Sequence, residues 1–469
     1  MSKVGRGISI VILVCMVLFC EIVAYTGVGS DITIQSTGGR LSNPDDTLRV
    51  WYADEEFSDY MASVSLAFYE ETNIRVIPTL VSGLEYLEAI YDISLEEGNY
   101  PDLYIATNDV LEKAYLSGLA TEIADVNNVV SLDGYPQTAL NAVTYNDKLV
   151  AYPLSFETSI FLYNKTYLYD MARSVIMLAE YEEMLLEDPT AEFYVEEPSE
   201  EEIAAMAAEL VPETLDDILM LANSYDAPSQ VEAVLEWDVT DVFYNYFFVG
   251  SSINMGGQYG DDITQIELYN EDALVSLQLY QNMQQFFSID ADEVTYETVV
   301  QDFIDGKIVF AFVTTDAIEQ IEDAKEDGIF VYEYEIGAIP NINEEIQAQS
   351  MSVTNAVVVN GFSTNQELAN ELAEFIAVTS SDSLYDMSGK IAAKSGISYE
   401  NVQLLDTFIE YEASVPITKM MEASNFWVQL EICMNRVWSM EDVEEQLRIL
   451  SETIMTQVTG ETYIQEPIG

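Results

Sequence analysis

The stretch YNDKLVAYPLSFETSIFLYNK covers residues 145–165 and is the most informative segment of this 469-residue sequence. Its second half is largely apolar, yet Glu157 stands among Phe156, Ile160 and Phe161. A carboxylate in such surroundings needs a partner, because burying an unpaired charge is costly. Glu157 is therefore either an acid with a partner or an ordinary surface acid.

Strand and helix patterns alternate on the N-terminal side of this stretch. Short β-like runs cover Leu48–Tyr52, Ile74–Val81 and Pro101–Ile105. Apolar residues at helical spacing follow the first run, and further helices are predicted over 84–95 and from Asn108 to Gly118. Strands that alternate with helices predict an α/β fold with a mostly parallel sheet covered on both faces.

The same alternation returns on the C-terminal side. Ile308–Val313 and Ala356–Val359 are predicted strands, and Thr364 with Glu367 has the spacing of a capping box that opens a helix to Val378. Helical spacing also covers 273–287 and the C-terminal stretch 402–458.

The segment Asp170–Val211 differs in composition from its surroundings. It holds thirteen acidic residues against the single base Arg173, its apolar residues keep helical spacing, and Ser199 with Glu202 has the spacing of a capping box. We interpret it as an inserted acidic helical pair. It is either a solvated decoration, which we favour, or a module that docks a partner.

The chain is strongly acidic, with 83 Asp and Glu against 16 Lys and Arg and a formal net charge of -67. This charge excludes nucleic acid as a partner. The acids are spread along the whole sequence, which favours a solvated surface over a cluster that binds cations. The chain has no histidine, so His metal ligands and Ser-His or Cys-His nucleophile pairs are excluded. We expect no cofactor and no metal.

The N-terminus has the pattern of an export signal. Lys3 and Arg6 precede an apolar run from Ile8 to Cys20, so residues 1–26 are predicted to be a signal sequence or an uncleaved membrane anchor. The residues before Cys15 and Cys20 are Val14 and Phe19, whereas a lipoprotein signal would have a small residue there. We expect an exported protein on the outer face of the cytoplasmic membrane, tethered by a lipid or by the uncleaved segment. Cys433, in an apolar helical pattern, is expected in the core.

Five blocks of sequence, in a fixed order, resemble one family. They are 145–165, Pro101-Asp102 with Asp109 and Ser117-Gly118-Leu119, Gly306-Lys307, Ile339-Pro340, and Asn425-Phe426-Trp427. From about Thr47 to Val458 the chain resembles the extracellular solute-binding proteins of carbohydrate ABC importers, family 1, which include maltose-binding protein. The resemblance implies a two-lobed periplasmic-binding-protein-like fold of type II, in which each lobe is a mostly parallel sheet flanked by helices and the ligand lies in a cleft at the hinge.

The resemblance also implies how the chain divides. It implies that 47–155 with 310–315 and 356–400 form lobe 1, and that 156–309 with 316–355 and 401–469 form lobe 2, which includes the acidic insertion 170–211. Residues 27–46 are predicted from their composition, rich in Gly, Ser, Thr, Asn and Asp, to be a flexible linker.

Matching the family position by position implies three main ligand contacts. Asp109 matches a carboxylate of the first lobe that binds ligand hydroxyls, Glu157 matches the carboxylate just past the first hinge crossing, and Trp427 matches a stacking aromatic of the second lobe. Asp109 has an alternative interpretation as a favourable charge in the first turn of a helix, and Trp427 as part of the core. Weaker matches add Glu55, Glu56, Asp241 and Tyr244.

Several positions depart from the maltodextrin-binding members. Ala106 and Asp316 stand where those members have tryptophans, Val110 and Glu431 where they have arginines, and Glu56 where they have a lysine. The cleft is therefore expected to be more acidic, which disfavours anionic ligands and favours amino sugars or cationic solutes. Asp316 and Glu431 are included among the candidate ligand-binding residues.

The resemblance implies a binding function without chemistry on the ligand. We expect a monomeric protein that delivers a small solute, a mono- or oligosaccharide, to the permease subunits of an ABC importer. One alternative keeps the fold as an anchored sensor ectodomain. Another is a glycosidase with two carboxylates, for which the sequence offers no specific motif.

Overall fold

The computed structural model describes residues 47–81, 83, 85–95, 100–189, 196–287, 289–291 and 293–468. The predicted signal or anchor, 1–26, and the predicted linker, 27–46, lie outside the described residues. None of the helices in the described part of the chain combines the length and the apolar character that a membrane crossing requires.

The first sheet is built mainly from the N-terminal strands. Strands β1 (Thr47–Tyr52), β2 (Arg75–Leu80) and β3 (Leu103–Thr107) are parallel, with β1 between the other two. Strand β12 (Met351–Val359) joins β3 in the antiparallel direction. Five helices follow these strands along the sequence: α2 (Ser58–Thr72), α3 (Tyr86–Ser94), α4 (Leu111–Leu116), α13 (Gln366–Glu374) and α14 (Leu384–Ser388).

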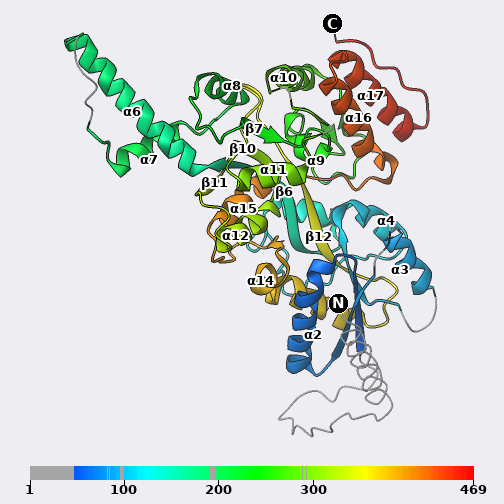
Figure 1. Cartoon of the computed structure of the whole chain (residues 1–469). Coiled ribbons are helices and arrows are strands. Elements are labelled where there is room, and N and C mark those ends of the chain that lie inside the picture. Colours follow the sequence, from blue (N-terminus) through cyan, green and yellow to red (C-terminus); the bar gives the residue numbers. More distant parts are fainter. Residues whose placement is uncertain are drawn as a thin grey trace, which may run out of the picture. The chain divides into compact units, whose positions relative to one another are not determined.

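Strand β6 (Tyr152–Asn164) continues from the first sheet into the second. Its residues 152–158 pair with β12 and its residues 159–164 pair with β10 and β11, so the two long strands lie side by side in the centre of Figure 1. Of its thirteen residues, Glu157 is the one that is not fully buried. The predicted lobe boundary, between residues 155 and 156, lies within β6.

The second sheet combines strands from distant parts of the sequence. Strand β10 (Ile308–Thr314) lies between β6 and β7 (Ala233–Trp237), parallel to β7, and β11 (Tyr334–Gly337) extends β6. The predicted lobe boundary placed 310–315 with the first lobe, whereas the hydrogen bonds place this strand in the second sheet. The boundaries of the lobes otherwise stay a prediction.

The remaining elements surround these sheets. Helices are α5 (Gln137–Val143), α8 (Leu215–Ser224), α9 (Val242–Asn245), α10 (Glu271–Phe287), α11 (Tyr296–Ile304), α12 (Ala317–Glu326), α15 (Gln403–Ala413), α16 (Phe426–Trp438) and α17 (Val443–Thr459). Short strands are β4 (Thr144–Tyr145), β5 (Lys148–Leu149), β8 (Asn254–Met255), β9 (Ile266–Glu267), β13 (Ile391–Ala392) and β14 (Val415–Pro416). Cys433 is buried in the core, as predicted.

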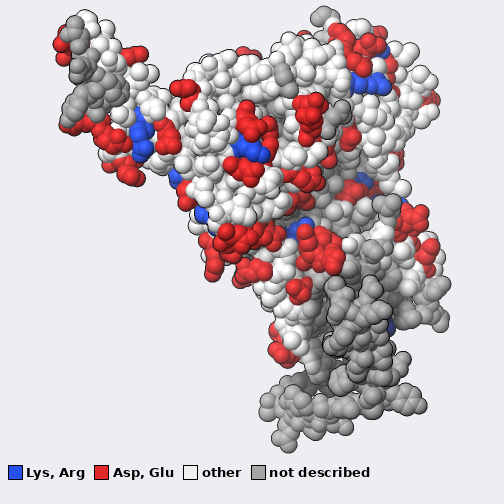
Figure 2. Space-filling model, viewed as in Figure 1, with Lys and Arg blue, Asp and Glu red and all other residues white. Residues whose placement is uncertain are grey.

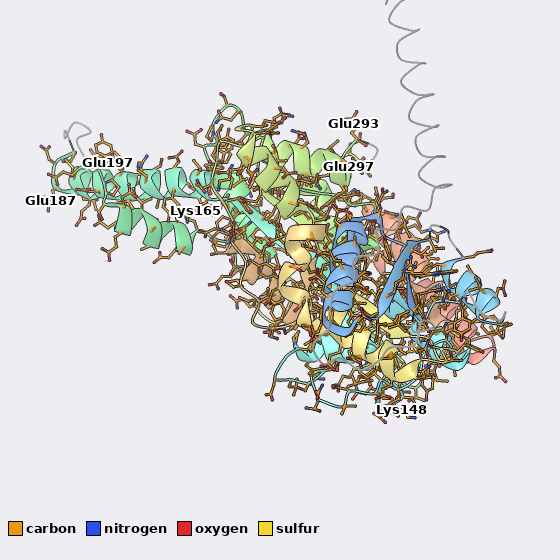
Figure 3. The ribbon with its side chains drawn as sticks, turned by 90° about the horizontal axis from the view of Figure 1, so that it is seen from below. Lys148, Lys165, Glu187, Glu197, Glu293 and Glu297 are labelled. Atoms are coloured by element: carbon orange, nitrogen blue, oxygen red, sulfur yellow. The ribbon has the colours of Figure 1, made fainter. Side chains whose placement is uncertain are left out.

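The segment 170–211 forms an acidic helix pair. Helix α6 (Lys165–Glu187) and helix α7 (Glu200–Glu209) pack together, and the predicted capping box of Ser199 and Glu202 opens α7. Figure 3 shows Lys165 at the start of α6 and Glu187 and Glu197 near its other end. The predicted helices and the capping box are therefore present among the described residues, and the interpretation of the pair as an insertion stays a prediction.

One predicted helix start is wrong. The capping box of Thr364 and Glu367 does not form, and α13 begins at Gln366 with Asn365 as its N-cap and no side-chain cap. The Ser363 hydroxyl instead accepts the N–H of Asn365, at 3.1 Å, and the chain turns one residue later than predicted.

The acidic residues are spread over the face of the molecule seen in Figure 2, with few basic side chains between them. This distribution agrees with the interpretation of the charge as mostly a solvated surface.

Candidate functional site

A cavity of about 570 Å³ opens where the parallel strands of the first sheet end. It is lined by residues that follow β1, by the last residues of β3, by Glu157 of β6 and by Asn355 of β12. The carboxyl ends of parallel strands are the usual place for ligands in α/β folds, because the loops diverge there. The position of this cavity therefore marks it as a candidate binding site.

Glu157 reaches this cavity from the long central strand. Its pKa is raised, first by burial and then by the negative charges of Asp316, Glu56 and Asp54, while Lys390 acts in the opposite direction. The predicted site residue Glu157 therefore lies where a ligand can reach it, in a group of acids contributed by three separate segments.

Lys390 is the base of this group, and sequence reasoning missed it. Its ammonium lies 3.3 Å from Asp54 Oδ2 and 2.5 Å from Glu56 Oε2. Burial alone would lower the pKa of Lys390, but the hydrogen bond to Glu56 and the charges of Asp54 and Glu56 raise it. Lys390 precedes β13, which pairs with β6, so the fold and not a local motif places it here.

The predicted pair Glu55 and Glu56 divides between two roles. Both are exposed and neither lines the cavity, but Glu56 is paired with Lys390, which does line it. Asp54, which was not predicted, lines the cavity, and one of its oxygens also accepts the N–H of Glu56 at 3.0 Å.

Asp109 lies at the edge of the same region. Its carboxylate is exposed and accepts a hydrogen bond from the hydroxyl of Thr107, and both Thr107 and Val110 line the cavity. Ala106 also lines it. The small side chains Ala106 and Val110 therefore leave room in the cavity that larger residues would fill.

A pair of stacked tyrosines lies close to this group of acids. The rings of Tyr244 and Tyr296 are 4.9 Å apart and nearly parallel, at 3°. The hydroxyl of Tyr296 donates to Asp316 Oδ1 at 2.7 Å. Burial raises the pKa of Tyr244 most, and the charges of Asp241, Asp316, Asp238 and Glu157 add to it. The predicted residues Tyr244, Asp316 and Glu157 therefore come together.

Asp241 and Glu431 lie near one another beside these tyrosines. Burial raises the pKa of Glu431, and the charges of Asp241 and Asp238 raise it further. Asp241 also caps α9, because its Oδ1 accepts the N–H of Phe243 at 2.7 Å. A structural role for Asp241 is therefore established, and its contact with a ligand stays a prediction.

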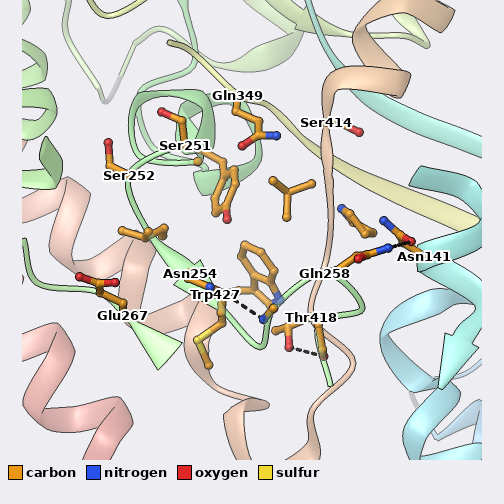
Figure 4. Close-up of a pocket in the computed structure, with 18 residues that line it drawn as sticks. Asn141, Ser251, Ser252, Asn254, Gln258, Glu267, Gln349, Ser414, Thr418 and Trp427 are labelled. Atoms are coloured by element: carbon orange, nitrogen blue, oxygen red, sulfur yellow. Dashed lines mark hydrogen bonds between the residues drawn. The ribbon is translucent and has the colours of Figure 1, made fainter. Parts of the chain in front are cut away.

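Trp427 lines a second cavity, of about 410 Å³, rather than the one that holds Glu157. Its ring packs against Phe426, at 4.8 Å, and Tyr246, at 5.5 Å. The other walls include amides and hydroxyls, among them Asn254 and Thr418, between which Trp427 lies in Figure 4, as well as the carboxylate of Glu267 and a few apolar side chains. An aromatic face with amide and hydroxyl neighbours can hold a sugar ring, so the predicted role of Trp427 stays a prediction.

A buried lysine lies beside this second cavity. Lys419 is 1% exposed, and its ammonium donates to the backbone oxygens of Asn141, at 3.1 Å, and Tyr259. Burial lowers its pKa to about 8, against the opposing charges of Asp261 and Glu112. Sequence reasoning missed Lys419, and its partners, distant in sequence, give no local signal.

No group of three or more His, Cys, Asp or Glu side chains in the described ranges is arranged to hold a metal ion. The candidate site is therefore described by its carboxylates, its lysines and its tyrosines.

Comparison with solved structures identifies the fold. The structure of a cyclo/maltodextrin-binding protein complexed with maltotetraose superposes with a TM-score of 0.69 at 19% identity, covering 91% of this chain and 100% of that one. The extracellular solute-binding protein from Staphylococcus aureus in complex with maltose superposes with a TM-score of 0.70 at 16% identity, covering 89% of this chain and 99% of that one. The maltose-binding periplasmic protein from Listeria monocytogenes gives 0.65 at 18%, covering 90% and 100%. The predicted two-lobed fold of type II is confirmed.

A family model assigns the chain more directly. No curated protein sequence matches it. The model of the bacterial extracellular solute-binding proteins, however, matches residues 66–414, which is well over half of the chain. The chain therefore belongs to the family of bacterial extracellular solute-binding proteins.

Proposed function

We propose that this protein is the sugar-binding component of an ABC importer and that its ligand lies against the cavity that holds Glu157. The observation that carries the proposal is the meeting of Glu157, Asp54, Lys390 and Asp316 with the stacked pair Tyr244 and Tyr296. Sugars offer hydroxyl groups and weakly apolar ring faces, and this group offers hydrogen-bond acceptors and an aromatic platform for them.

The charge of the site supports a neutral or cationic sugar. The site has two lysines: Lys113 is paired with Glu88, and Lys390 is paired with Asp54 and Glu56. Glu157 and Asp316 add two more carboxylates, so acids outnumber bases, and the charges of Asp54, Glu56 and Asp316 already raise the pKa of Glu157. A ligand carboxylate would meet this repulsion, whereas an amino group would relieve it. We therefore expect amino sugars to bind at least as well as neutral sugars and uronic acids to bind poorly.

A thermal-shift and calorimetric screen tests this proposal. The panel holds maltose, maltotriose, glucosamine, chitobiose and glucuronate, with spermidine and Ca²⁺ as cations that are not sugars. A ligand at 100 times its dissociation constant stabilises the fold by about 2.7 kcal/mol. We expect a shift from a neutral or amino sugar and none from glucuronate. A response to spermidine or Ca²⁺ without any response to sugars would overturn the ligand class.

Variants locate the ligand. Glu157→Gln and Tyr244→Ala are expected to weaken binding of the sugar found in the screen, and Asp109→Ala and Trp427→Ala test the two other predicted contacts. Glu55→Gln is the matched control, because Glu55 is exposed and lies outside the cavity lining. Unchanged affinity in the first four variants would contradict the site.

The partners follow from the family and remain proposals. We propose that the protein acts as a monomer outside the cytoplasmic membrane, held there by its N-terminal residues 1–26, and that it passes the ligand to the permease subunits. Deleting the gene should abolish uptake of the ligand, and expression of a Glu157→Gln protein should not restore it.

A further inference from the structure

A groove of about 990 Å³ lies between the acidic helix pair and helix α8. One wall is the face of α6 from Asp170 to Leu178, the second is the face of α8 from Asp217 to Ser224, and residues 209–213 close one end. This groove has no residue in common with the two cavities described above.

The floor of the groove is apolar and open to solvent. Met171, Val175 and Leu178 recur at the spacing of one helix face on α6, and α8 contributes Met220 and Leu221. Val175 is 39% exposed, Leu178 55% and Met220 61%. An apolar stripe along a helix normally packs against another element, and methionines make such a surface adaptable. Within the described part of the chain, these apolar faces of α6 and α8 therefore stay exposed instead of packing against a third element.

The rim of the groove is acidic. Asp170, Glu209, Glu213, Asp217 and Asp226 line it, and none of the described lining residues is Lys or Arg. The nearby base Arg173 is already paired, 3.5 Å from Asp170 and 2.9 Å from Glu197. A partner must therefore bring the positive charge.

Helix ends add to this negative potential. Glu209 is the last residue of α7, and Asp226 follows the end of α8 at Ser224. The C-terminal end of a helix carries a partial negative charge, so a carboxylate there is unfavourable and a cation is favourable. Both carboxylates occupy positions where a docked Lys or Arg would gain from the helix dipole as well as from the charge.

From these observations we propose that the groove docks a cationic amphipathic helix of a partner protein. Its apolar side would pack on Val175, Leu178 and Met220, and its Lys or Arg residues would face Glu209 and Asp226. A helix is about 10 Å wide, so the volume fits about two turns. A second copy of this chain is a poor occupant, because its net charge of -67 would meet the same charge.

A designed peptide tests the proposal with the full-length chain. The probe is a labelled 18-residue helix of Leu and Lys with all Leu on one face, and the comparison is an isomer of the same composition with the Leu scattered. Fluorescence anisotropy should give binding of the first peptide that is at least tenfold tighter than that of the second. The affinity of the first peptide should fall several-fold between about 50 and about 300 mM salt, because the rim of the groove is charged. Equal binding of the two isomers would overturn the proposal.

Paired variants locate the peptide. Leu178→Ser with Met220→Ser should weaken binding at least tenfold, and Glu209→Gln with Asp226→Asn should weaken it and reduce its salt dependence. The matched control is Leu186→Ser, because Leu186 lies on α6 outside the groove lining and is 86% exposed. Circular dichroism confirms that each variant is folded. The proposal would be contradicted if Leu186→Ser lost as much affinity as the groove variants. It would also be contradicted if the groove bound vesicles of anionic lipid and not the peptide.

Discussion

The buried carboxylate of Glu112 accepts the backbone N–H of Met421 at 2.6 Å, across 309 residues of sequence. The other oxygen of Glu112 accepts the hydroxyl of Tyr145 at 3.0 Å. A parallel contact joins the side-chain amide of Asn108 to the backbone oxygen of Ile417, at 2.9 Å. These bonds hold the segment that leads into α16, and with it Trp427, against the N-terminal part of the fold.

Replacing Glu112 should show how much this contact stabilises the fold. Glu112→Ala leaves the N–H of Met421 and the hydroxyl of Tyr145 without their acceptor, and we expect the free energy of unfolding to fall by about 1–3 kcal/mol. Glu112→Gln keeps an acceptor and removes a carboxylate that burial disfavours, as the raised pKa of Glu112 indicates. Its loss of unfolding free energy should therefore be smaller. Urea unfolding measures both. Glu122→Ala, at an exposed ion pair with Lys148, is the control and should cost less than about 0.5 kcal/mol; equal losses would refute the role of Glu112.

Stability should fall as the pH rises from about 4.5 to 7. Burial raises the pKa of Glu410 from 4.5 to about 7, against the opposing hydrogen bond from the N–H of Ile339. In this range the folded state keeps a proton on Glu410 that the unfolded state releases. The stabilisation is therefore complete below the pKa of Glu410 in the unfolded state, and it is lost as the pH rises through the pKa in the folded state. For a buried group the change is about 3 kcal/mol.

The Glu410→Gln variant isolates this effect. Its melting temperature should depend less on pH between 5 and 8 than that of the unchanged protein. Glu412→Gln is the control, because Glu412 is exposed on the same helix, α15. The explanation fails if the two variants have the same pH profile.

Gly250 should not tolerate a side chain. A Cβ atom there would lie 1.9 Å from the backbone oxygen of Gln349 and 2.9 Å from the ring of Tyr246. Gly250→Ala must therefore displace backbone beside the Trp427 cavity, and we expect a loss of about 1–3 kcal/mol in thermal unfolding. Ser252→Ala is a close control, because the buried hydroxyl of Ser252 has no hydrogen-bond partner among the described residues. Its removal should be neutral, and a loss as large as that at Gly250 would contradict the steric cause.

Removing Lys390 should change which sugars bind. Lys390→Ala leaves Asp54 and Glu56 without their cation and removes the charge that lowers the pKa of Glu157. We expect the affinity ratio of glucosamine to a neutral sugar to rise about tenfold, which corresponds to about 1.4 kcal/mol. Calorimetry at low salt measures the ratio. Lys325→Ala, at an exposed pair with Glu333, should leave it unchanged; a fall of the ratio in Lys390→Ala would count against the acidic site.

The features that were predictable from the sequence are those that a local pattern of residues determines. The run Ile308–Val313 became a fully buried strand, and the Ser199 and Glu202 box opened α7. Glu157 was recognised through the resemblance of its stretch to the family, and it lies on β6. The Thr364 box did not form, because the helix begins one residue later, with Asn365 as its N-cap, and the Ser363 hydroxyl accepts the N–H of Asn365.

Contacts between distant segments were not predictable. Lys390 lies far along the chain from Asp54 and Glu56, and nothing in the residues around it distinguishes it from the other bases. The Glu112 carboxylate and the buried Lys419 likewise find their partners only through the tertiary fold. Sequence therefore indicated which elements form and which acids are candidates, whereas the neutralising and anchoring residues required the structure.

The path of β6 and β12 also sets the order in which the molecule can be made. Strand β3, at residues 103–107, pairs with β12, whose residues 351–359 are synthesised after most of the second sheet. The first sheet therefore cannot be completed during early synthesis, and its late long-range pairing slows folding.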